Sequence, residues 1–118
     1  MGVAHNKSYF EWFELGRTEF CRSRGLPYRD IEARGCYLVV AEALCRYIKP
    51  LRYDEEFIIR IALAEAGLRK VVFSYELRSV PGGALVAVGR TVHVSVNRRA
   101  EVCALPDDIL AKIKGEAA

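Results

Sequence analysis

The feature that most constrains the fold is one amphipathic helical stretch followed by four long β-rich stretches. Over residues 8–24, apolar residues recur at the spacing of a single helix face, at Tyr9, Trp12, Phe13, Gly16 and Phe20. The later stretches favour strands separated by short turn signals, and they cover residues 35–48, 57–64, 68–79 and 85–97. A helix of ~17 residues spans ~25 Å and a strand of ~12 residues spans ~40 Å, so one helix fits across such a sheet. We predict one α+β domain over residues 1–118, with a long helix wrapped by a curved antiparallel sheet and a short helix at 106–114.

Charge and cysteine content exclude several classes of function. Lys and Arg total 18 against 15 Asp and Glu, and this small surplus is spread along the chain, which argues against a nucleic-acid partner. No apolar run approaches the ~18–20 residues of a membrane span. The four cysteines include no Cys-x-x-Cys pair and the chain has only two histidines, so we predict no metal site. Cysteines within apolar segments are typical of buried thiols in a reducing compartment, and we expect a cytoplasmic protein.

The first twenty residues carry a specific pattern. Gly2, Tyr9, Phe13, Glu14 and the run Arg17-Thr18-Glu19 stand at the places where the 4-hydroxybenzoyl-CoA thioesterase family has its matching residues. The chain therefore resembles that family of hot-dog proteins over essentially its whole length, although the matches in the strands are weaker. The resemblance implies a hot-dog fold of five strands, of which four are visible here. It also implies an acyl-CoA thioesterase that works as a homodimer or a dimer of dimers, with coenzyme A as part of the substrate and no other cofactor.

The same resemblance implies where the thioester binds. In the family, a backbone N–H at the place of Asn6 polarises the thioester carbonyl, because free N–H groups at a helix start carry partial positive charge. Related hot-dog thioesterases place a carboxylate about two turns further on, where Glu14 stands here. We predict Asn6 and Glu14 as catalytic positions. The predicted substrate contacts are Gly2, Val3, His5, Tyr9, Phe13, Arg98 and Arg99.

Each of these residues also has a purely structural interpretation. Glu14 is suited to an ion pair with Arg17 three residues later. His5 suits a loop histidine bound to backbone, and aromatic residues at helical spacing, such as Tyr9 and Phe13, are typical of a core. Solvated charge explains Arg98 and Arg99 equally well. His93 is expected to lie on a strand face without a catalytic role.

The sequence departs from the family at its start. The family's catalytic Asp would lie two positions before Met1, after a first strand. We therefore expect this polypeptide to lack that carboxylate and to leave one sheet edge unpaired. Two further functions stay open: a non-catalytic protein that binds acyl-CoA, and a dehydratase of hydroxyacyl thioesters that would use His5 with Glu14.

Overall fold

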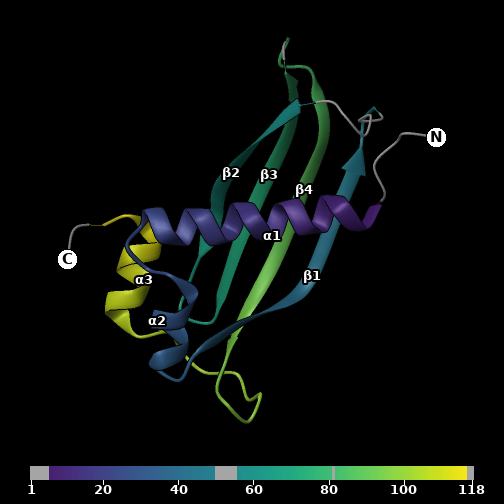
Figure 1. Cartoon of the computed structure of the whole chain (residues 1–118). Coiled ribbons are helices and arrows are strands. Elements are labelled where there is room, and N and C mark those ends of the chain that lie inside the picture. The colour runs from purple at the N-terminus through teal and green to yellow at the C-terminus, as the bar shows by residue number, and fades with distance from the viewer. Residues whose placement is uncertain (1–5, 50–55, 81, 117–118) are drawn as a thin grey trace.

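The protein consists of one antiparallel sheet with a long helix on one face. The computed structural model describes residues 6–49, 56–80 and 82–116. Its elements are α1 (Asn6–Ser23), α2 (Tyr28–Ala33), β1 (Tyr37–Tyr47), β2 (Glu56–Ala66), β3 (Lys70–Val80), β4 (Leu85–Val96) and α3 (Asp107–Lys114). The strands are ordered β1-β4-β3-β2, and every neighbouring pair is antiparallel. Figure 1 shows α1 lying across the strands, with α2 and α3 together at one end of the sheet. The predicted α+β architecture is confirmed.

The long helix differs from the prediction mainly at its start. It is already helical at Asn6, so Ser8 lies in the first turn and is not the residue at which the helix begins. The helix ends in a left-handed glycine, because Gly25 takes the left-handed conformation at φ 71°. The N–H of Gly25 donates to the Arg22 carbonyl, and the N–H of Leu26 donates to the Cys21 carbonyl, both at 2.9 Å. This pair of bonds is the usual way to satisfy the last carbonyl groups of a helix.

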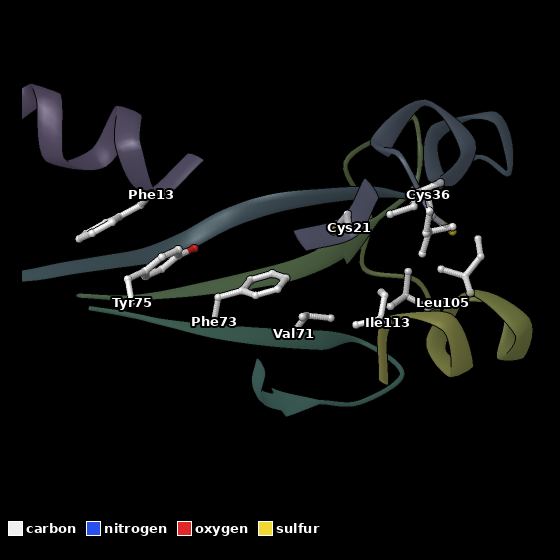
Figure 2. Close-up of a cluster of buried hydrophobic side chains, with 11 residues drawn as sticks. Phe13, Cys21, Cys36, Val71, Phe73, Tyr75, Leu105 and Ile113 are labelled. Carbon is white, nitrogen blue, oxygen red and sulfur yellow. The ribbon is translucent and has the colours of Figure 1, made fainter. Parts of the chain in front are cut away.

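The core lies between α1 and the inner face of the sheet. Phe13 is fully buried and stacks on Tyr75, with ring centroids 4.4 Å apart. Figure 2 shows this core as a row of side chains that runs along the sheet from Phe13 to Ile113 beside α3. A Cβ placed on Gly89 would collide with the Phe13 ring, so the helix approaches β4 closely only because position 89 has no side chain.

The two edge strands of the sheet are β1 and β2. Among the described residues, β1 pairs only with β4 and β2 only with β3. Both β1 and β2 are therefore edge strands within the described part of the chain. Across that same part, no helix is long and apolar enough to cross a bilayer.

Candidate active site

An open cavity of about 310 Å³ lies beside the middle of α1. The helix forms one wall, and the strands β1 and β4 form the other. The lining residues are Phe10, Glu11, Glu14, Arg17, Val40, Ala43 and Thr91. The α1 members share one helix face because they are spaced about one turn apart. The cavity therefore combines apolar walls with several polar groups, which is typical of ligand sites.

Arg17 is the charged group buried in this cavity wall. Its side chain is only 8% exposed, and its Nη1 donates a hydrogen bond of 3.2 Å to the Tyr75 hydroxyl. Burial alone would lower the pKa of Arg17, but the contacts to Tyr75 and Tyr28 outweigh it and raise the pKa. The guanidinium is therefore a permanent positive charge. Its Nε is buried and has no hydrogen-bond partner among the described residues.

A chain of buried polar groups continues from Arg17 into the sheet. The Tyr75 hydroxyl lies 2.6 Å from the Thr91 Oγ1, and the same Oγ1 lies 2.9 Å from the His93 Nε2. Burial, and secondarily the charge of Arg17, lower the pKa of His93 to about 4. The imidazole is thus neutral at pH 7. This series of hydrogen bonds holds the Arg17 side chain in place through Tyr75. It also makes the side of the cavity next to the sheet polar.

Glu14 lies on the rim of the cavity, exposed to solvent. Its main-chain carbonyl accepts a hydrogen bond of 3.0 Å from the Thr18 hydroxyl. The alternative in which Glu14 forms an ion pair with Arg17 is not observed within the described residues, where Arg17 turns inward to Tyr75 instead. Glu19, further along α1, does form a surface ion pair, with Arg22 at 3.0 Å. Glu14 therefore lines the cavity without an ion-pair partner among the described residues.

The structure separates the other predicted site residues. Gly2, Val3 and His5 lie outside the described residues, and Asn6 is described only as the first residue of α1. Tyr9 and Phe13 are buried in the core, as their structural interpretation expects. Phe10, one position away from the apolar stripe, lines the cavity instead.

Arg98 and Arg99 lie far from the start of α1 within one chain. They occupy an exposed turn just after β4, where the Arg99 N–H donates to the Asn97 side chain at 2.9 Å. This turn follows Val96, which pairs with the first residue of β1, whereas Tyr9 contacts the ring of Tyr47 at the last residue of β1. The two ends of β1 are ~33 Å apart at ~3.3 Å per residue.

Sequence reasoning placed none of Arg17, Tyr75 and Thr91 in the site, and it treated Arg17 only as part of the family pattern and as a surface partner for Glu14. One signal was available for Arg17, which stands four residues after Phe13 and four before Cys21 on the buried side of α1. A charged residue within the apolar face of a helix indicates a buried charged side chain with a functional role. The inward position of Thr91 had no such signal, because β4 has buried residues on both faces. Only the pairing of Thr91 with Phe73, whose ring contacts Phe20 of α1, shows that Thr91 lies on the face toward the helix. Among the described residues, no three His, Cys, Asp or Glu side chains are grouped so that they could hold a metal ion.

Comparisons with known proteins agree with this architecture. The family model described as "Thioesterase-like superfamily" matches residues 1–113. A protein of Aquifex aeolicus, provisionally named an esterase, is 33% identical over 96% of this chain and 86% of its own length. The Bacillus subtilis protein YneP, provisionally named an acyl-CoA thioesterase, is 29% identical over 83% of this chain and 70% of its own. The crystal structure of the hypothetical protein TT1821 from Thermus thermophilus superposes with a TM-score of 0.88 at 32% identity, covering 97% of this chain and 86% of that one.

Proposed function

This chain belongs to the thioesterase-like superfamily and has the hot-dog fold, and we propose that it hydrolyses acyl-CoA thioesters in the cavity beside α1. Thioester hydrolysis is the general chemistry of this family, and an acyl-CoA substrate is supported by the name of the Bacillus subtilis relative. The observation that carries the proposal is the cavity itself. Its rim carries Glu14, which has no ion-pair partner among the described residues, beside an apolar space on a helix whose start has partial positive charge.

The proposed reaction has two groups in named roles. The backbone N–H at Asn6 donates to the thioester carbonyl and then to the oxyanion, since the start of α1 carries partial positive charge. Glu14 accepts a proton from a water molecule as the water oxygen attacks the carbonyl carbon. The tetrahedral intermediate collapses, the C–S bond breaks, and the thiolate of coenzyme A takes up the proton from Glu14. The products are a carboxylic acid and free coenzyme A.

The spacing along α1 suits this division of roles. Eight residues separate Asn6 from Glu14, and at ~1.5 Å per residue this is about 12 Å along the helix axis. A carbonyl oxygen at ~2.9 Å from an N–H and a water at a similar distance from a carboxylate fill much of that span. Side chains on a helix lean toward its N-terminus, so the Glu14 carboxylate leans toward Asn6.

A second copy of the chain would complete the site through β1. The outer edge of β1 is unpaired among the described strands and exposes Val39, Val40, Leu44 and Tyr47. If two β1 strands pair antiparallel about a two-fold axis near their centres, the first residue of one lies beside the last residue of the other. The turn that carries Arg98 and Arg99 of one copy would then lie near the start of α1 in the other. There the two arginines can meet the phosphates of coenzyme A.

The proposal is tested by thiol release from a panel of acyl-CoAs. We expect release by the wild-type chain and a loss of at least 10²-fold in kcat for Glu14→Gln, which is the usual effect of removing a general base. Glu19→Gln is the matched control, because Glu19 lies on the same helix but pairs with Arg22 outside the cavity. Activity of Glu14→Gln equal to that of the control would remove Glu14 from the mechanism.

The same panel separates hydrolysis from simple binding. If no acyl-CoA releases thiol but calorimetry detects acyl-CoA binding, the protein is a binding module and the proposed activity is wrong. If neither release nor binding is detected with any acyl-CoA, the substrate class itself is wrong.

A further inference from the structure

We propose that the cavity selects acyl groups that end in a carboxylate, and that Arg17 is the residue that determines this specificity. The inference rests on the proposed function for the thioester end of the ligand, and it concerns the opposite end of the acyl chain.

A buried positive charge without an anion is the observation that demands explanation. Arg17 is more than nine-tenths buried, and no carboxylate of the described residues lies within ion-pair distance of it. Burying an unpaired charge is expensive, and proteins almost always pair such groups or neutralise them. Arg17 stays charged, because its contacts to Tyr75 and Tyr28 raise its pKa. An anion that enters the cavity would supply the missing partner.

The geometry of Arg17 leaves donors for such an anion. A guanidinium has five N–H groups, of which one donates to Tyr75 and the contact to Tyr28 occupies another, so three are left. Tyr75 is itself held by Thr91 at 2.6 Å, so the arginine is fixed from below. Both Arg17 and Thr91 line the cavity. A planar, pre-oriented guanidinium matches the two oxygens of a carboxylate better than any other side chain does.

The two glutamates of the cavity do not cancel this attraction. Glu11 and Glu14 are exposed on the rim, where water and salt weaken their repulsion of an incoming anion. Arg17 is buried, so its attraction acts through a medium of lower dielectric constant. The same rim carboxylates disfavour an anion at the mouth, which directs the negative end of an acyl chain inward.

The walls between rim and floor accept a short apolar chain. Phe10, Val40 and Ala43 provide that surface. A volume of about 310 Å³ equals about ten water-sized volumes of ~30 Å³, which is enough for an acyl chain of a few carbons. The cavity thus has an apolar middle and a cationic floor, and a dicarboxylic acyl group has the matching pattern.

Two thioesters of equal length provide the test. Glutaryl-CoA ends in a carboxylate where pentanoyl-CoA ends in a methyl group. We expect kcat/KM of the wild-type chain to be at least tenfold higher for glutaryl-CoA. In Arg17→Met this preference should disappear or reverse, whereas Arg22→Met, which changes an exposed arginine of the same helix, should keep it.

A second variant decides the question if Arg17→Met does not fold. Ala43 lines the cavity from β1 and is exposed, so Ala43→Glu is compatible with folding. Its carboxylate would pair with Arg17 and occupy the place of the ligand's anion, so the preference for glutaryl-CoA should again be lost. Ala62→Glu adds the same charge to an exposed position of β2 outside this cavity and should preserve the preference.

A binding measurement separates this inference from the proposed hydrolysis. Monomethyl glutarate and methyl pentanoate imitate the two acyl groups as oxygen esters, and their dissociation constants are measured by NMR titration. Binding of monomethyl glutarate at least tenfold tighter, and dependent on Arg17 or on the absence of Glu at position 43, supports the inference even if no thioester is hydrolysed. Hydrolysis of both thioesters at equal rates, or equal binding of both esters, overturns it and leaves the proposed hydrolysis intact.

Discussion

At the scale of single residues, Gly89 shows how one missing side chain determines the position of α1. The Phe13 ring occupies the space that a Cβ at position 89 would need. The same ring stacks on Tyr75. The sequence shows Gly89 only as one member of an alternating strand, so its role depends on a contact between distant segments. Local pattern cannot reveal such a contact.

This packing predicts opposite effects for two glycine substitutions. Gly89→Ala should lower the free energy of unfolding by about 1–3 kcal/mol, because the buried ring has to move. Gly16→Ala is the control, since its Cβ would lie 3.4 Å from the Ile59 side chain and alanine is the better helix former by up to about 1 kcal/mol. Urea denaturation measures both. Equal stability of Gly89→Ala and the wild type would mean that α1 is free to shift away from β4.

At the scale of the elements, the sequence was sufficient for the order and type of α1, the four strands and α3, but the short helix α2 was not predicted. Periodicity located α1 and all four strands. Strand alternation also separated the two faces of β4, but it could not show that the face with Thr91 and His93 is the one directed toward α1, since Val92 on the other face is buried as well. That choice is made by pairing with β3, where these residues stand beside Phe73 and Val71. The cavity could not be predicted from the sequence either, because it is formed by three elements that come together only in the folded chain.

The burial of His93 on β4 predicts how the stability of the fold depends on pH. The pKa of His93 in the folded protein is about 4, below the usual value of 6.5, because the side chain is buried and close to Arg17. As pH falls below 6.5 the unfolded chain takes up a proton that the folded chain does not, so the folded state loses stability. The loss should reach about 3 kcal/mol by pH 4 and be absent above pH 7.

Urea denaturation between pH 7 and pH 4.5 measures this effect. His93→Gln keeps a polar side chain beside Thr91 but does not titrate, so its stability should fall much less over the same range. Asp108, whose pKa is lowered by its hydrogen bond from Arg34, responds to pH below its usual value of 3.8 and leaves this window undisturbed. If the two proteins lose stability in parallel, His93 is not the group responsible.

At the scale of the whole molecule, the residues proposed for the site lie at two ends of the sheet. The start of α1 and the Arg98–Arg99 turn lie at opposite ends of β1, and the apolar residues of its outer edge are exposed between them. The proposed dimer, in which β1 pairs with a second β1, would account for both features. In that dimer the exposed edge is covered and the arginines of each copy approach the helix start of the other.

A charge at the centre of that edge tests the arrangement and its link to function. Leu44 is 61% exposed on β1, and Leu44→Lys should convert the dimer to a monomer in light scattering and reduce thiol release by more than tenfold. Ile58→Lys places the same charge on the other outer strand, where Ile58 is 45% exposed, and should leave the dimer intact. A monomeric Leu44→Lys protein with full activity would show that one chain suffices for hydrolysis. Arg98 and Arg99 would then have no part in binding coenzyme A at the helix start, because within one chain β1 holds them apart.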